Sequence, residues 1–166
     1  APVGWQAGEL EKRATPLDGM TGGISHFAGT TDASTRGRNM GISGEPADNP
    51  KDPWYCAMRF NYCKVAVDPK NPYWVKPIPG SSDLALKSVL EGLRLKVTNP
   101  ANGKAVVVRP ADWGPGAWAK PNADGKPYRV IDVSAHAERM LGAATDDRVV
   151  VEWVDPQTPL GPTGSN

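Results

Sequence analysis

The fold is decided by residues 95–153, which open with Leu95-Lys-Val-Thr-Asn-Pro-Ala-Asn-Gly-Lys-Ala-Val-Val-Val-Arg109. Two runs rich in β-branched residues flank the turn Pro100-Ala-Asn-Gly103, where Gly supplies the positive φ that a tight hairpin needs. The pattern predicts a β-hairpin whose second strand continues to an acid, Asp112, directly before a loop of Trp, Gly and Pro. A carboxyl group at a strand end beside an aromatic loop is a typical place for chemistry.

The rest of this stretch alternates between strand and helix patterns. Tyr128-Arg-Val-Ile-Asp-Val-Ser134 predicts a strand, and Ser134-Ala-His-Ala-Glu-Arg-Met-Leu-Gly142 predicts a short helix with Ser as its N-cap and Gly at its end. Arg148-Val-Val-Val-Glu-Trp-Val154 then predicts a closing strand. Asp132, at the strand-to-helix junction, is interpreted as a structural acid that accepts hydrogen bonds from the backbone there.

In this order, the segments VTNPANGKAVVVRPADWGPG, YRVIDVSAHAERMLG and DRVVVEWV resemble the double-psi β-barrel of the RlpA-type lytic transglycosylases, the barwin proteins and the expansins. Those families share a VTN-x-x-NG-K hairpin, an Asp-x-Gly-Pro loop, an Ile/Leu-Asp-Leu/Val-Ser segment and a Val-rich closing strand. The resemblance implies a mainly β fold, a six-stranded double-psi β-barrel with two short helices and long loop insertions. It is close over residues 95–154 and loose over the preceding part of the chain.

Length and composition fit one domain, because 166 residues can bury a single core of ordinary size. The 18 Gly and 17 Pro residues favour a turn-rich β protein over a helical bundle. We expect an N-terminal arm over residues 1–21, the barrel domain over 22–154 and a flexible tail, rich in Pro and Gly, over 155–166.

Before the deciding stretch, the sequence predicts two further strands, one helix and two insertions. Gly22–Gly29 resembles the opening strand of the barrel, and Trp54–Tyr62 has the aromatic and alternating character of a second strand. Residues 36–53 and 68–79 are insertions rich in turn-forming residues, and loops of this kind are usually functional or disordered. Ser81–Gly92 carries apolar residues at helical spacing and predicts the other short helix.

Charge and cysteine content exclude several classes of partner. A net charge of +1 creates no long-range field, so we expect neither nucleic acid nor an anionic membrane as a partner. No apolar run approaches the roughly 18 residues that a membrane-spanning helix needs. Cys56 and Cys63 are separated by six residues, which is not a zinc spacing, so neither a metal nor another cofactor is expected. A disulfide and two reduced thiols both remain open. We expect the chain to act as a monomer.

Asp112 is the candidate catalytic residue. The resemblance implies that it transfers the proton in a lytic transglycosylase acting on peptidoglycan, and its counterpart in expansins is needed for wall loosening. One acid can suffice because the sugar's own hydroxyl closes onto the anomeric carbon, whereas ordinary glycoside hydrolysis uses two carboxylates. Burial against Trp113 or Pro110 would raise the pKa of Asp112 and keep its carboxyl protonated. The alternative is an Asp that only caps the turn.

Four further residues are candidates for binding the substrate. Trp113 and Trp118 flank the loop after Asp112, and the flat face of an exposed indole suits the apolar face of a pyranose ring. Thr31 and Asp32 belong to a polar loop like the one that the related families place beside the substrate groove. The alternatives are packing within the loop for the two Trp residues and an Asx turn for Asp32.

The sequence departs from the RlpA-type pattern at one position. Those enzymes pair their Asp with a His from the second strand region, and Tyr55–Phe60 contains no His. Arg59, or His26 from the opening strand, could supply a polar group in its place, although the family motif supports neither. A lone His beside Phe27 is more often a satisfied histidine of a core or strand edge.

Three classes of function follow from these observations. The first is a lytic transglycosylase that cleaves peptidoglycan glycan strands. The second is a binding or loosening module, similar to expansins, that grips peptidoglycan or cellulose without cleaving it. The third is a structural wall or virion protein that keeps only the barrel, in which the 36–53 or 68–79 insertion would cover Asp112. The first two imply a secreted protein or one of the cell envelope, and the third also allows a virion.

Overall fold

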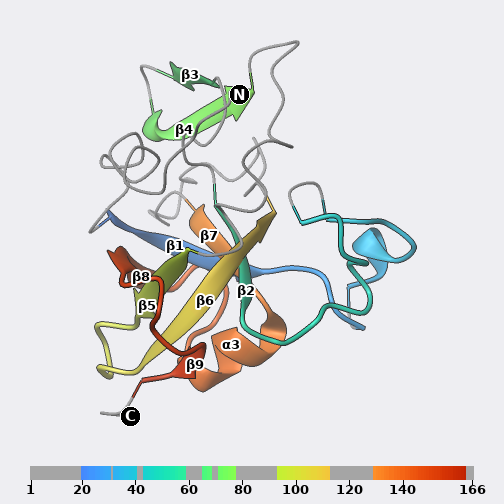
Figure 1. Cartoon of the computed structure of the whole chain (residues 1–166). Coiled ribbons are helices and arrows are strands. Elements are labelled where there is room, and N and C mark those ends of the chain that lie inside the picture. Colours follow the sequence, from blue (N-terminus) through green and yellow to red (C-terminus); the bar gives the residue numbers. More distant parts are fainter. Residues whose placement is uncertain are drawn as a thin grey trace.

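The computed structural model describes residues 20–30, 32–40, 43–58, 65–68, 71–77, 93–112 and 129–163. Within these residues the fold is mainly β, as the sequence predicts (Figure 1). The elements are β1 (Met20–His26), η2 (Ala33–Thr35), β2 (Tyr55–Met58), β3 (Val65–Asp68), β4 (Asn71–Pro77), β5 (Arg94–Thr98), β6 (Ala105–Asp112), β7 (Arg129–Val133), α3 (Ala135–Met140), β8 (Arg148–Val154) and β9 (Gly161–Pro162).

Six strands form a closed ring. They hydrogen-bond in the order β2-β7-β1-β8-β5-β6, and an additional pairing of β2 with β6 joins the two ends. The pairs β1–β7 and β2–β6 are parallel, and the other four pairs of the ring are antiparallel. Closure satisfies backbone groups that an open sheet would leave exposed at its edges. β3 and β4 pair with each other in a separate two-stranded sheet.

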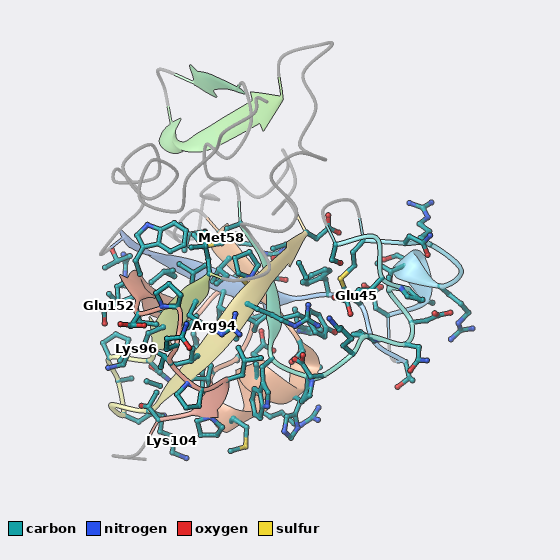
Figure 2. All side chains as sticks on the ribbon, viewed as in Figure 1. Glu45, Met58, Arg94, Lys96, Lys104 and Glu152 are labelled. Atoms are coloured by element: carbon teal, nitrogen blue, oxygen red, sulfur yellow. The ribbon has the colours of Figure 1, made fainter. Side chains whose placement is uncertain are left out.

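The ring encloses the hydrophobic core. Its buried side chains come from all six strands, from α3 and from the residues directly before β5 and after α3, and they are Ile24, Cys56, Met58, Leu93, Leu95, Val97, Val106, Val108, Val130, Ile131, Val133, Ala137, Leu141, Val149 and Val151. β5 alternates between buried and half-exposed residues, so one of its faces meets the core and the other faces outward. On the outward side, Lys96 of β5 stands opposite Glu152 of β8, and both are half-exposed (Figure 2).

The predicted hairpin is confirmed. β5 and β6 pair antiparallel up to Thr98 and Ala105, and Gly103 adopts a φ of 76° in the turn. The side-chain amides of Asn99 and Asn102 both donate to the carbonyl of Leu141, at 2.9 and 3.0 Å. The Asn residues of the VTN-x-x-NG-K motif therefore have a structural role, because they satisfy a carbonyl at the end of α3 that the helix itself leaves unpaired.

Helix α3 is also confirmed. The Ser134 hydroxyl accepts a hydrogen bond from the Ala137 N–H at 2.9 Å and donates to the carbonyl of Pro53. The first contact caps the helix, and the second fixes its start against the segment before β2. The helix ends at Met140, and Gly142 follows its C-cap, Leu141, with a φ of 63°, the left-handed conformation that Gly adopts readily.

Several expectations concern other parts of the chain. The helix predicted over 81–92 and nearly all of the N-terminal arm lie outside the described residues. The opening and second strands form as β1 and β2, each with different bounds from those predicted. In the segment expected to be a flexible tail, β9 pairs antiparallel with β6 through Val106 and Val107. Figure 1 shows β9 at the same end of the ring as α3.

Candidate functional site

Asp112 is the last residue of β6, in the parallel pair that closes the ring. Its partner in the register is Ala57 of β2, and the register shifts between Cys56 and Ala57, as in a β-bulge. Bulges re-aim side chains and are frequent beside functional sites. The Asp112 side chain is half-buried, whereas the preceding residues of β6 are buried throughout. The candidate acid therefore lies where β6 leaves the covered part of the ring.

A second carboxylate occupies the same row of the ring. Ala57 stands opposite Asp112 on one side and opposite Asp132 of β7 on the other. Neighbouring strands are about 4.8 Å apart, so the two Asp backbones are separated by roughly 10 Å across β2. Asp132 is half-buried like Asp112. Its place is consistent with the structural interpretation and also puts a second ionisable group near the candidate acid.

The insertion of residues 36–53 packs against β6 directly before Asp112. The Ser43 N–H donates to the carbonyl of Ala111 at 3.0 Å. Ala111 also belongs to a second buried cluster, on which the partly buried Phe27 packs, and the cluster consists of Ala28, Met40, Ala47, Tyr55 and Ala111. The insertion therefore covers β6 up to the residue next to the candidate acid.

An arginine inside β6 holds the same insertion in place. The Arg109 guanidinium contacts Glu45 through two hydrogen bonds, of 2.6 and 3.2 Å, and Asp52 through one of 2.8 Å. The side chains of Arg109 and Glu45 are only 6% and 10% exposed, whereas that of Asp52 is 28% exposed. Glu45 is labelled in Figure 2, on the segment between the ring and η2.

Arg109, Glu45 and Asp52 form a triad of ionisable groups, and the hydrogen bonds within it stabilise the charged forms of Glu45 and Arg109. Burial by itself would raise the pKa of Glu45, but hydrogen bonds from Arg109 and from the Lys51 N–H hold that pKa below its ordinary value. Burial likewise works against the charge of Arg109, and its bonds to Glu45 and Asp52 raise its pKa nevertheless. Glu45 and Arg109 therefore face each other as a charged pair at neutral pH.

Asp32 forms the predicted Asx turn. Its carboxylate accepts hydrogen bonds from the N–H groups of Ala28 and Ser34, at 2.9 and 3.0 Å, and from the Ser34 hydroxyl at 2.6 Å. Burial would raise the pKa of Asp32, but these hydrogen bonds outweigh it and lower that pKa. The carboxylate therefore orders the loop after β1, and its contact with a sugar stays a prediction.

His26 lies at the end of β1 beside α3. Its Nδ1 atom is 3.1 Å from Glu138 Oε1, and the Thr145 hydroxyl is 3.4 Å from the other Glu138 oxygen. The imidazole is 43% exposed at the side chain, whereas Glu138 is almost covered, at 11%. The contact explains how a Glu can be buried on α3. His26 has a partner at the end of β1, and its contact with a substrate stays a prediction.

The remaining predicted site residues are Thr31, Arg59, Trp113 and Trp118, and all four lie outside the described residues. Their assignment to the substrate site stays a prediction. Of the two cysteines, Cys56 is described and is a buried free thiol. Burial raises the pKa of this thiol, so it remains protonated and inert at neutral pH.

A pocket of about 400 Å³ lies beside the start of β2. Three segments that are distant in the sequence form it, namely residues 28–30, 50–55 and 134–139. Its wall includes Tyr55, whose hydroxyl donates to the Phe27 carbonyl at 3.0 Å and whose pKa burial raises to about 12. Asp112 is not among the lining residues. Tyr55, on the pocket wall, lies opposite Arg109 of β6, and Asp112 is three positions further along that strand, or roughly 10 Å away.

Sequence reasoning missed the charged residues of this pocket and of the triad. Lys51 and Asp52 belong to an insertion without a motif, and Arg139 was predicted only as part of a short helix, so no local signal singled them out. Arg109 did offer a signal, because a cation within a Val-rich strand needs acidic partners once it is buried. The acids of the 36–53 insertion were the available candidates, but spacing alone could not choose among them.

In comparisons with known proteins, no family model matches the chain and no curated protein matches it significantly. Among the described residues, no three His, Cys, Asp or Glu side chains gather in a way that could hold a metal ion. In the same part of the chain, every helix is too short or too polar to cross a membrane.

Proposed function

We propose that this protein acts on cell-wall polysaccharide, in the manner of the RlpA-type lytic transglycosylases that its sequence resembles. In this proposal the ring of six strands is a double-psi β-barrel. Its closure by β2 and β6, and its two parallel pairs in an otherwise antiparallel ring, support that assignment. The substrate would be the glycan strands of peptidoglycan, which places the protein outside the cytoplasm in the cell envelope or in a secreted form.

The observation that carries the proposal is the position of Asp112. Its carboxyl group is half-buried at the end of β6, beside the bulge that interrupts the β2–β6 pair. A general acid must be reached by the substrate, and the half-exposed carboxyl group at the end of β6 leaves a route for it. Asp112 would protonate the glycosidic oxygen and then accept the proton of the sugar hydroxyl that closes onto the anomeric carbon.

Incubation with purified peptidoglycan, followed by analysis of soluble products, tests this role. We expect anhydro-muropeptides from the native chain and none from Asp112→Asn. Asp155→Asn is the matched control, because Asp155 is an exposed residue that caps the turn after β8 and should leave the products unchanged. Equal product formation by Asp112→Asn and the native chain would exclude Asp112 as the general acid.

The second candidate is a glycan-binding or loosening module without catalysis, similar to expansins. It is favoured by the lack of His in β2, where the RlpA-type enzymes place the partner of their Asp. In that case the chain should be retained on peptidoglycan or cellulose without releasing products. The structural alternative draws support from the contact of Ser43 with Ala111, which brings the insertion next to Asp112. That alternative predicts neither retention nor products.

A further inference from the structure

The pocket beside the start of β2 differs from the Asp112 site in charge. Lys51 and Arg139 line it and are exposed, and within the described part of the chain neither forms an ion pair. His136 is a third nitrogen-bearing side chain on the same wall. The local surplus is therefore positive, although the whole chain carries a net charge of only +1.

The one acid that lines the pocket, Asp52, is already engaged. One of its oxygens accepts the Trp54 N–H at 2.6 Å, and the other accepts from Arg109 Nε at 2.8 Å. Both of its oxygens thus have partners, and its charge is offset by Arg109. Lys51 and Arg139 remain as the charges that an incoming group would meet.

The pocket is also held in shape before any ligand arrives. The Ser134 hydroxyl joins the start of α3 to the Pro53 carbonyl, and the Trp54 ring packs on His136 with centroids 5.0 Å apart. The Gly29 N–H donates to the Ala47 carbonyl at 2.7 Å and fixes the third segment. A site whose walls are fixed in this way loses little conformational entropy on binding.

We propose that this pocket binds a carboxylate-bearing sugar unit of the glycan. Lys51 and Arg139 would contact the carboxylate, with Arg139 able to form a two-pronged hydrogen bond, and the walls of Tyr55 and Pro53 would contact the apolar side of the unit. The inference rests on the proposed polysaccharide function and extends it, because it selects glycans with free lactyl carboxylates, such as peptidoglycan strands without stem peptides, over neutral ones such as cellulose.

A pair of sugars that differ in the charge of the carboxyl group tests the proposal. N-acetylmuramic acid carries a lactyl carboxylate, and its methyl ester keeps the same sugar and lactyl group without the charge. In NMR titrations of the intact chain we expect the first to shift the pocket resonances and the second to bind more weakly, by up to about five-fold, as for one charge contact at a solvent-exposed site. Lys51→Gln and Arg139→Gln should each lower the affinity for N-acetylmuramic acid by about the same factor.

The matched controls are Lys104→Gln and Arg148→Gln, which remove exposed cations that do not line the pocket. Both should bind N-acetylmuramic acid as the native chain does; Lys104 is labelled in Figure 2. Equal affinity for the two sugars, or an unchanged affinity in both pocket variants, would overturn the proposal. Displacement of the acidic sugar by equimolar inorganic phosphate would also overturn it, because the site would then take any anion.

The outcome can be separated from that of the proposed function. If N-acetylmuramic acid binds through Lys51 and Arg139 while peptidoglycan is neither retained nor cleaved, the pocket stands and the polysaccharide function fails. If Asp112-dependent products form while the two sugars bind alike, the function stands and the assignment of the pocket fails.

Discussion

Replacement of Arg109 by Met should destabilise the fold strongly at neutral pH. The guanidinium is 6% exposed and is the only described cation that contacts Glu45, whose side chain is 10% exposed. Met fills much of the same volume, so the main effect is a buried carboxylate without its counter-charge. Breaking a buried ion pair by removing one partner costs about 3–5 kcal/mol. We expect the lower end, about 3 kcal/mol, because Asp52 is 28% exposed and can be hydrated.

The measurement is thermal and urea unfolding of the native chain and of Arg109→Met at pH 7. For a chain of this size, a loss of about 3 kcal/mol lowers Tm by about 6–12 °C. Arg148→Met is the matched control, because Arg148 is exposed on β8 and its loss should change the free energy of unfolding by less than about 0.5 kcal/mol. In the double variant Arg109→Met with Glu45→Met, part of the stability should return, because both charges are then absent.

The effect of Arg109→Met on the free energy of unfolding should depend on pH. The pKa of Glu45 is lowered in the folded chain, so its contribution is complete above the unfolded value of 4.5 and is lost as the pH falls through the folded pKa. The stability difference between the native chain and Arg109→Met should therefore narrow as the pH is lowered below about 4.5. A difference that is equal at pH 3 and pH 7, or one below about 0.5 kcal/mol at pH 7, would refute the argument.

Three further predictions concern local structure. Ser134→Ala should cost about 1–2 kcal/mol in chemical unfolding, because it removes the N-cap of α3 and the bond to the segment before β2. Gly142→Ala should cost about 1–2 kcal/mol in the same assay, since φ is 63° and a Cβ would come within 2.8 Å of Asn102 Nδ2; a neutral result would show that Asn102 moves away freely. Asp32→Ala should speed hydrogen exchange of the Ala28 and Ser34 amides, which donate hydrogen bonds to its carboxylate. The amides of the ring strands are the internal control.

Local patterns were sufficient for the elements of the deciding stretch. The hairpin of β5 and β6 followed from β-branched runs around a Gly-containing turn, and α3 from a Ser cap and a Gly stop. Both signals act within a few residues, through backbone dihedral preferences and capping hydrogen bonds. The place of Asp112 at the end of β6 followed from the same hairpin, so this part of the candidate site was also predictable.

The sequence by itself thus determined the mainly β character, the hairpin, the short helix and the strand that carries the candidate acid. Only the tertiary structure decided that β2 closes the ring against β6, that Asp132 shares a row with Asp112, and that Arg109 binds acids 64 and 57 positions away. It also decided that three distant segments enclose a positively charged pocket. The physical reason is that dihedral preferences are local, whereas strand pairing and buried ion pairs depend on which distant segments pack together once the whole core is buried.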